Sequence, residues 1–291
     1  MRKFAWVVLL LVIGAVFRIS TPESSEGATI FNKPILDVIY EPSSYPIVEE
    51  MLNMASVTSD DLVYDLGCGD GRIVIMAAKL RGAKGVGIDL DPVRIQESRQ
   101  NAQKEGVADK VVFYEQNLFE ADISRATVVL IYLFPEVNLR LRPKLLRELN
   151  PGVRIVSHSH TMGEWEADST RNVGGHDLHY FVVPANVSGK WKGPDMEGKP
   201  ISLSLTQEFQ QVQGKMSIGS ETYPIRTIGL EGKEISFTLE RKVGGSNRLL
   251  FFNGRFSGDT LEGTIVNEGG HYAGTPWKAV RDPSTKVTIA K

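Results

Sequence analysis

The chain has 291 residues, a net charge of −2, 23% charged residues and 42% apolar residues. This length accommodates two domains, and the composition is that of a folded protein. No lysine- or arginine-rich run is present, so the sequence lacks the electrostatic footprint of a nucleic-acid-binding protein, and we expect no nucleic-acid partner. The single cysteine, Cys68, excludes an internal disulfide.

Residues 1–19 contain an apolar segment. Two basic residues precede fourteen apolar or small residues, Phe4 to Phe17, and Arg18 follows them. This pattern is typical of a signal peptide or an uncleaved membrane anchor, and no clean small-x-small cleavage site follows closely. Because spanning hydrocarbon usually takes about 20 residues, a segment of this length could also lie in the membrane interface. Residues 20–33 are polar and predict a linker.

Residues 34–184 alternate between short apolar runs and longer amphipathic segments, which predicts a Rossmann-like α/β sheet. Helices are expected to begin near Pro46, Arg72, Pro92 and Glu136. The apolar runs that predict strands are 62–65, 85–88, 110–114, 126–133, 154–156 and, closing the sheet, 179–184.

The stretch 62–91 organises this domain. Its first apolar run ends on Asp65 and passes directly into Gly67-Cys68-Gly69-Asp70-Gly71. A helical pattern follows, and a second apolar run then ends on Asp89. This is one βαβ unit with a glycine turn, and the three glycines allow the backbone to approach a ligand that a Cβ atom would exclude.

The acids around this turn indicate which ligand it binds. A dinucleotide fingerprint would need a third glycine where Arg72 stands. Asp65 and Asp70 flank the turn and would repel a pyrophosphate. Asp89 follows Gly67 by 22 residues, a spacing that suits a carboxylate accepting ribose hydroxyls. A nucleoside with cationic groups and no phosphate fits best, and S-adenosylmethionine (SAM) is such a molecule.

Two motifs carry a resemblance to a known class. Asp65-Leu66-Gly67-Cys68-Gly69-Asp70-Gly71 resembles motif I of class I SAM-dependent methyltransferases, and Gly87-Ile88-Asp89-Leu90-Asp91-Pro92 resembles their ribose-binding strand end. Together with IYLFPEVNLRLRPKL and RIVSHSHTMGEW, they resemble small bacterial relatives of the mitochondrial membrane-anchored protein-lysine methyltransferase family, over roughly residues 34 to 184. The resemblance implies methyl transfer from SAM to an acceptor amine, with a protein lysine as the favoured acceptor.

The resemblance also implies cofactor contacts. In the family an N-terminal segment folds over the cofactor, which makes Tyr40 and Ser43 candidate contacts. Where the family usually carries an acid for the adenine amino group, this chain has Asn117, whose side-chain carbonyl can accept the same bond. Leu118 or Phe119 is expected to pack on the adenine ring. The expected cofactor contacts are Tyr40, Ser43, Asp65, Gly67, Gly69, Gly71, Asp89, Leu90, Asn117 and Leu118.

Two residues are candidates for the acceptor side. An amine acceptor must be uncharged when it attacks, so desolvation and a nearby proton acceptor favour the reaction. Tyr132 and His158 end neighbouring predicted strands, and we predict that they position the acceptor. His158 and His160 are conceivable zinc ligands, but neither a cysteine nor an H-E-x-x-H pattern accompanies them, so no metal is expected.

Residues 185–291 have a different texture. Short runs with a period of two are separated by glycine turns, for example at 201–205, 214–218 and 234–239. Six to eight antiparallel strands in a small β-barrel or sandwich are expected. Trp191 and Trp277, near its two ends, are expected to pack together and close it. No catalytic motif is present in this part.

Two other functions remain open. A small-molecule methyltransferase would be indicated by a cavity inside the second domain. A non-catalytic, membrane-tethered SAM-binding or scaffold protein would have intact cofactor loops and no acceptor pocket.

The location of the protein follows from two opposing arguments. Basic residues before the apolar segment predict a cytoplasmic N-terminus and an exported remainder. Use of SAM instead predicts a cytosolic enzyme. We expect attachment to the membrane with the catalytic domain in the cytoplasm, and export is the alternative.

Overall fold

The computed structural model describes residues 40–194, 198, 200–243, 246–267 and 274–289. The expected membrane segment at 1–19 and linker at 20–33 therefore lie outside the described residues. Within these described ranges, no helix is both long enough and apolar enough to cross a membrane.

The first domain is built on a seven-stranded sheet with the order β3-β2-β1-β4-β5-β7-β6. The first five strands in this order are parallel, whereas β7 is antiparallel to both β5 and β6. The strands are β1 (Leu62–Leu66), β2 (Lys84–Asp89), β3 (Val111–Glu115), β4 (Val128–Ile131), β5 (Arg154–His158), β6 (Ser169–Val173) and β7 (His176–Val182). The Rossmann-like sheet expected from the sequence is confirmed.

One strand of this sheet was not predicted. The run at 179–184 was expected to close the sheet, but β7 lies inside it and β6 forms the edge. β6 has the sequence STRNV, and four of its five residues are exposed. A strand that buries so little has no apolar alternation from which it could be recognised.

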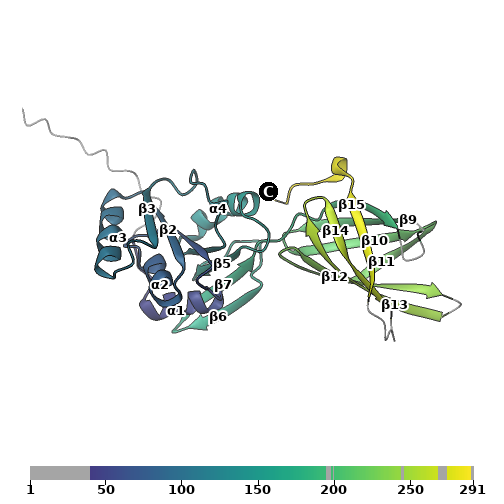
Figure 1. Cartoon of the computed structure of the whole chain (residues 1–291), viewed down its shortest axis with the longest axis horizontal. Helices are drawn as coiled ribbons and strands as arrows, with labels where there is room; N and C mark the ends of the chain where they lie inside the picture. The colour runs from purple at the N-terminus through teal and green to yellow at the C-terminus, as the bar shows by residue number, and fades with distance from the viewer. Residues whose placement is uncertain (1–39, 195–197, 199, 244–245, 268–273, 290–291) are drawn as a thin grey trace, which may run out of the picture. The chain divides into compact units, whose positions relative to one another are not determined.

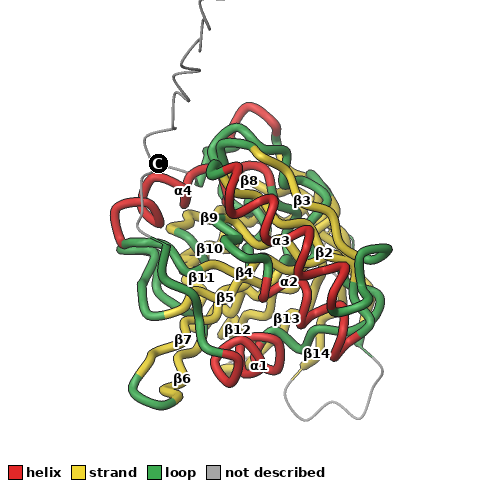
Figure 2. Tube along the Cα trace, turned by 90° about the vertical axis from the view of Figure 1, so that its left-hand side faces the viewer, coloured by secondary structure: helices red, strands yellow, loops and turns green. Residues whose placement is uncertain are grey.

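Helices cover both faces of the sheet. They are α1 (Tyr45–Met54), α2 (Arg72–Arg81), α3 (Pro92–Lys104) and α4 (Pro135–Glu148). The buried side chains of α1, α2 and α3 belong to one apolar cluster, and those of α4 to the cluster on the other face. α2 and α3 lie side by side (Figure 2). α3 begins where Asp91 accepts a hydrogen bond from the backbone N–H of Val93, and Pro92 occupies its first turn.

The second domain is a closed barrel, not a sandwich. Its strands have the order β10-β11-β12-β13-β14-β15-β8-β9, and every neighbouring pair is antiparallel. Figure 1 shows most of these strands, coloured from green to yellow. They are β8 (Gly189–Pro194), β9 (Pro200–Glu208), β10 (Gln211–Ile218), β11 (Glu221–Glu231), β12 (Glu234–Val243), β13 (Ser246–Ser257), β14 (Thr260–Asn267) and β15 (Thr275–Arg281). Buried aliphatic and aromatic side chains from most strands of the barrel fill its interior.

The sequence pattern predicted neither β8, in which Trp191 alone is buried, nor β11. In β11 the pairing with β12 contains a bulge between Ile225 and Thr227. The next apolar residue after Ile225 is therefore Ile228, three positions on, and not the residue two positions on that a regular strand would have. Such a bulge breaks the period of two by which strands are recognised.

The two tryptophans of the barrel pack on different rings. Trp191 lies against Phe256, with ring centroids 5.1 Å apart. Trp277 makes edge contacts with Phe237 and Phe252 instead. The expectation that the two tryptophans pack on each other is therefore wrong, although both are part of the same buried cluster.

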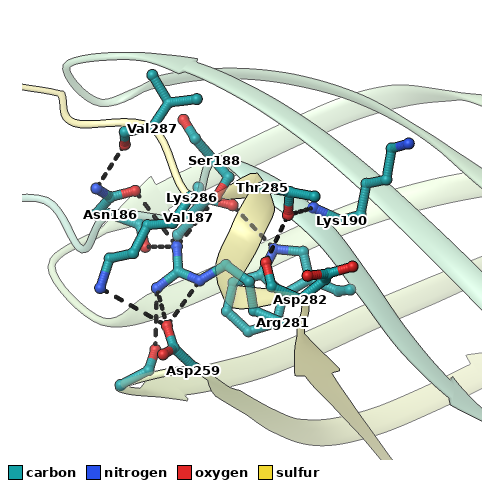
Figure 3. Close-up of polar contacts among 12 residues, drawn as sticks. Asn186, Val187, Ser188, Lys190, Asp259, Arg281, Asp282, Thr285, Lys286 and Val287 are labelled. Carbon is teal, nitrogen blue, oxygen red and sulfur yellow. Dashed lines mark hydrogen bonds and ion pairs between the residues drawn. The ribbon is translucent and has the colours of Figure 1, made fainter.

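A polar network joins the last strand of the barrel, β15, to the segment that precedes its first strand, β8 (Figure 3). Where the structure describes both strands, β15 pairs with β8 at Val280 with Lys192 and at Arg281 with Trp191. Arg281 is 3% exposed, and its guanidinium lies 4.7 Å over the Trp191 ring. It donates hydrogen bonds to Asp259 and to the backbone carbonyls of Asn186 and Ser188. These bonds tie the seam between β15 and β8 to the segment before β8 and to Asp259 in the β13–β14 turn.

One barrel residue contributes to the core of the first domain. Phe209, between β9 and β10, belongs to the apolar cluster on the α4 face of the sheet. We expect a fragment of residues 34–184 to fold, because its sheet and helices are complete, but to lose roughly 3 kcal/mol of stability, the typical cost of deleting a buried phenylalanine. Urea unfolding followed by the fluorescence of Trp165 would measure this. Full-length Phe209→Ala should show the same loss, and an aggregated fragment would contradict the prediction.

Candidate active site

A pocket opens at the carboxyl ends of the parallel strands. From β1 the chain continues to β2 on one side of it, whereas β4 lies on its other side. The strand order therefore reverses at β1, and open α/β sheets bind their ligands at such a switch point. The pocket is lined by residues 40–43, by the glycine loop after β1, and by residues that follow β2, β3 and β4.

The glycine loop has the backbone that only glycine adopts readily. Gly67, Gly69 and Gly71 have φ values of +86°, +50° and +80°. A Cβ atom on Gly67 would lie 2.8 Å from Leu133, and one on Gly69 would lie 2.4 Å from Tyr40. The loop therefore requires glycine for its conformation and for close packing. All three predicted glycines lie in this loop, and Gly67 and Gly69 line the pocket.

Asp89 lies at the end of β2 and holds this loop. Its carboxylate accepts hydrogen bonds from the backbone N–H groups of Gly69 at 2.8 Å and of Asp91 at 2.9 Å. Each carboxylate oxygen retains acceptor capacity, since an ionised carboxylate offers about four acceptor positions. Asp89 lines the pocket, as does the adjacent Leu90.

Asp65 is the least satisfied charged group in the pocket. It is 1% exposed, and neither of its carboxylate oxygens has a hydrogen-bond partner among the described residues. Burial, followed by the negative charges of Asp89 and Asp70, raises the pKa of Asp65 well above its ordinary value. A buried carboxylate without a partner is costly, so this arrangement suits a ligand that brings a positive charge.

The far end of the pocket is lined by Asn117 and Leu118. The Asn117 side-chain carbonyl accepts a bond from the backbone N–H of Phe119 at 3.0 Å, and its second lone pair remains for a ligand. Phe119 itself packs under the guanidinium of Arg140, 4.2 Å from the ring centroid, and is not part of the pocket lining. Of the two residues expected to pack on an adenine ring, Leu118 lines the pocket and Phe119 does not, so the adenine contact of Leu118 stays a prediction.

The segment 40–43 forms one wall of the pocket. The side chain of Tyr40 lies against Gly69 and under the guanidinium of Arg94, 4.6 Å from the ring centroid. Ser43 is buried, and its hydroxyl shares a hydrogen bond of 2.8 Å with Nδ1 of His158. Both residues line the pocket, as expected for a segment that covers the ligand.

The two predicted acceptor-side residues lie together, but only Tyr132 lines the pocket. The ring of His158 lies 3.9 Å from the Tyr132 ring and is 2% exposed. Burial, followed by the nearby His176 and His160, lowers the pKa of His158 to about 4. His158 is therefore neutral at pH 7. Its ring packs against Tyr132, and its Nδ1 atom shares a hydrogen bond with Ser43.

Comparison with known proteins agrees with this geometry. The family model described as the ANTKMT methyltransferase domain matches residues 65–169. A protein-lysine N-methyltransferase from Saccharolobus islandicus is 43% identical over 146 residues, which are 50% of this chain and 91% of that protein. A human lysine N-methyltransferase named for ATP synthase is 33% identical over 182 residues, covering 60% of this chain and 74% of the human protein.

The chain belongs to the ANTKMT methyltransferase family. It is similar to the crystal structure of an RNA methyltransferase from Salinibacter ruber in complex with S-adenosylhomocysteine (SAH). The sequence identity is 48% and the TM-score 0.50, and the match covers 50% of this chain and 96% of that one. The expected class, a SAM-dependent methyltransferase with SAM as cofactor, is confirmed.

The pocket of this family member fits SAM. The unpartnered carboxylate of Asp65 suits the ammonium group of the methionine part. Asp89 presents free acceptor positions toward ribose hydroxyls, and Leu118 and Asn117 suit the adenine. These residue roles stay predictions.

Two further residues build the site and were not predicted as site residues. Arg72 pairs with both carboxylate oxygens of Asp70, and its Nη1 donates to the carbonyl of Ser43 at 2.9 Å. Burial would raise the pKa of Asp70, but the hydrogen bonds and charge of Arg72 lower it. This pair ties segment 40–43 to the glycine loop. Its signal in the sequence is an acid and a base two residues apart at the start of a helix.

Cys68 is part of the same loop, and its buried thiol donates weakly to the carbonyl of Gly69. Burial, followed by the charges of Asp65 and Asp89, raises the pKa of the thiol well above its ordinary value. Since the thiolate is the reactive form, a redox role is disfavoured, and Cys68 acts as a small residue of the loop.

Replacing Asp89 by alanine should weaken SAH binding by roughly 1.5–3 kcal/mol, because a charge-assisted hydrogen bond is lost and Gly69 loses its acceptor. Calorimetry with SAH and with adenosine would measure this, and both ligands should lose affinity because both contain the ribose. Unchanged SAH affinity would exclude the ribose role.

The buried His158 predicts a specific dependence of stability on pH. Its folded pKa, about 4, is below its ordinary value of 6.5. The contribution of neutral His158 to the free energy of unfolding is therefore fully present above pH 6.5. It is lost as the pH falls toward 4, by up to about 3 kcal/mol. Urea unfolding across this range would show a flatter profile for His158→Asn than for the wild type. Parallel profiles would contradict the prediction.

Proposed function

We propose that the protein is a SAM-dependent protein-lysine methyltransferase. The observation that carries the proposal is the 43% identity to a protein-lysine N-methyltransferase of which the matched region covers 91%. The match to the human lysine methyltransferase supports the same acceptor. The pocket adds a site for the cofactor with aromatic residues on one side of it.

The cofactor supplies a methyl group on a sulfonium, and the chain must provide geometry and an environment for the amine. Most of the rate enhancement can come from holding the amine in line with the methyl group. Burial and the Glu41 carboxylate, to which the hydroxyl is hydrogen-bonded, raise the pKa of Tyr132, so Tyr132 keeps its proton at pH 7. We assign Tyr132 to positioning the acceptor and Glu41, which also lines the pocket, to holding the ammonium group of the acceptor, whose proton leaves to solvent before the amine attacks. His158 acts through Tyr132 and Ser43 as a positioning residue.

RNA is a second candidate acceptor, because the similar protein from Salinibacter ruber is named as an RNA methyltransferase. The net charge of −2 does not favour a polyanion. A small-molecule acceptor held in the barrel is disfavoured by the apolar side chains that fill the barrel interior. A non-catalytic scaffold is disfavoured by Tyr132 and Phe134, which line the pocket after β4, a strand that is separated by β1 from β2 and its Asp89.

The acceptor class can be tested directly. Purified full-length protein is incubated with a cell lysate and SAM labelled in its methyl group, and the labelled material is treated with protease or with RNase. Protease-sensitive, RNase-resistant label supports the proposal. If RNase removes the label, or if only small molecules carry it, the acceptor is not a protein and the proposal is wrong.

We also propose that residues 1–19 attach the enzyme to a membrane with its catalytic domain in the cytoplasm. The support is the apolar stretch from Phe4 to Phe17 with basic residues on both sides. An alkaline phosphatase fusion behind residue 33 would be active only after export. An inactive fusion in the membrane fraction supports the proposal, whereas an active one would show that the remainder is exported.

A further inference from the structure

Residues 159–168, which we call the acceptor-side loop, leave the sheet at the carboxyl end of β5. β5 lies next to β4, which is followed by Tyr132. The ring of His160 in this loop lies 6.2 Å from the Tyr132 ring and 6.3 Å from the Phe134 ring, and both of these residues line the pocket. The loop therefore borders the pocket on the side that the proposed function gives to the acceptor.

Helix α4 holds the first part of the loop. The Nδ2 atom of Asn138 donates to the carbonyls of His160 and Thr161, each at 3.3 Å. Arg142, one turn further along α4, donates from Nη1 to the carbonyl of Met162 at 2.9 Å. These bonds fix the backbone of residues 160–162.

The barrel holds the last part of the loop. The tip of the β9–β10 hairpin places Phe209 against Trp165, with ring centroids 6.3 Å apart and ring planes within 12° of each other. The neighbouring Gln210 donates from Nε2 to the carbonyl of Glu166 at 2.7 Å. Elements of both domains thus hold the same loop.

The hairpin tip and the residues around it have features that cost stability. Phe209 has a φ of +50°, a left-handed conformation that is costly for a residue with a side chain. Arg142 stacks over the Phe209 ring at 5.2 Å. Among the described residues, Nε of Arg142, Nε1 of Trp165 and Oε1 of Gln210 are buried without a hydrogen-bond partner. Such strain and unsatisfied polar atoms are rare in a core and concentrate at functional contacts.

We propose that the hairpin tip, Phe209 and Gln210, positions the acceptor-side loop, so that the barrel sets the geometry in which the acceptor meets the cofactor. This rests on the proposed function for the role of the loop, but the contact between hairpin and loop can be tested independently. Phe209 and Gln210 do not line the cofactor pocket, so they are positioning residues and not catalytic residues.

The test compares Phe209→Ala and Gln210→Ala with Phe256→Ala in the full-length protein bound to SAH. Phe256 is equally buried in the barrel but packs on Trp191, away from the loop. Hydrogen exchange of amides 159–168 should rise about tenfold or more in the two hairpin variants and not in Phe256→Ala, since opening of the loop costs less once its support is removed. SAH affinity should stay within about threefold of the wild type, a change of less than 1 kcal/mol.

Methyl transfer to lysate protein gives the second readout. For the hairpin variants kcat/KM for the acceptor should fall about tenfold or more while SAH affinity is retained, because only the acceptor side is misplaced. If Phe209→Ala does not fold, Phe209→Leu and Gln210→Ala decide the outcome. Unchanged exchange of the loop, or an equal effect of Phe256→Ala, would overturn the proposal. A wild type that binds SAH and labels no protein would refute the proposed function, while the exchange experiment would still decide the contact.

Discussion

Asp65→Asn should weaken SAH binding by about 100-fold or more and, at the same time, stabilise the ligand-free protein. The affinity falls because a buried carboxylate loses its charge toward the ammonium group of the ligand, an interaction worth about 3 kcal/mol or more. The ligand-free variant is more stable than the wild type because neither oxygen of Asp65 has a partner among the described residues. Burying an uncharged amide there costs less free energy than burying a carboxylate. Calorimetry and thermal unfolding would measure the two effects.

A ligand without the amino-acid part provides the control. Methylthioadenosine retains the nucleoside but lacks the ammonium group, so its affinity should be nearly the same for Asp65→Asn and for the wild type. In contrast, Asp89→Ala should weaken both ligands. An equal loss for SAH and methylthioadenosine in Asp65→Asn would show that Asp65 shapes the loop and does not bind the ammonium group.

The stability effect also has a defined pH dependence. The folded pKa of Asp65 is raised above its ordinary value of 3.8. The contribution of such a group is fully present below the unfolded pKa and is lost as the pH rises through the folded pKa. Ligand-free wild type should therefore lose stability relative to Asp65→Asn as the pH rises above about 4.

Arg281→Ala should destabilise the barrel by about 2–4 kcal/mol, because two carbonyls lose their donor at about 1–3 kcal/mol each, whereas the ion pair with Asp259, which is 41% exposed, adds little. Arg281 is 3% exposed, and its loss would leave buried carbonyls of Asn186 and Ser188 without their donor. Arg281 itself pairs with Trp191 across the seam between β15 and β8, so its loss acts directly on the closure of the barrel. Urea unfolding of the full-length protein would measure the loss.

Arg255→Ala is the matched control. Arg255 pairs with Glu234 across two barrel strands, but both side chains are more than half exposed. Surface ion pairs contribute about 0–1 kcal/mol, so this variant should unfold close to the wild type. Equal losses for the two arginine variants would show that the buried network at the seam has no special role.

The parts of the fold that bury a regular pattern could be predicted from the sequence. The parallel strands and the glycine loop carry apolar runs and turn residues of defined spacing, and the structure has them near the expected positions. β6 and β11 could not be recognised, because one is largely exposed and the other contains a bulge. Local pattern carries no information about such tertiary features.

The site shows the same division. Every predicted cofactor residue that lies at a strand end, such as Asp65 and Asp89, also lines the pocket, because strand ends meet at one edge of a parallel sheet. His158 also ends a strand, but its side chain lies behind Tyr132 and outside the pocket lining. The contact of Phe209 with the acceptor-side loop joins residues far apart in the sequence, and a single sequence gives no sign of it.

The most direct test of the account is tandem mass spectrometry of proteins after incubation with the full-length enzyme and SAM carrying a deuterated methyl group. The label should be found on the ε-amine of lysine, and Asp65→Asn should produce far less of it at the same SAM concentration. Label confined to RNA or to small molecules, or the absence of any label from an enzyme that binds SAH, would contradict it.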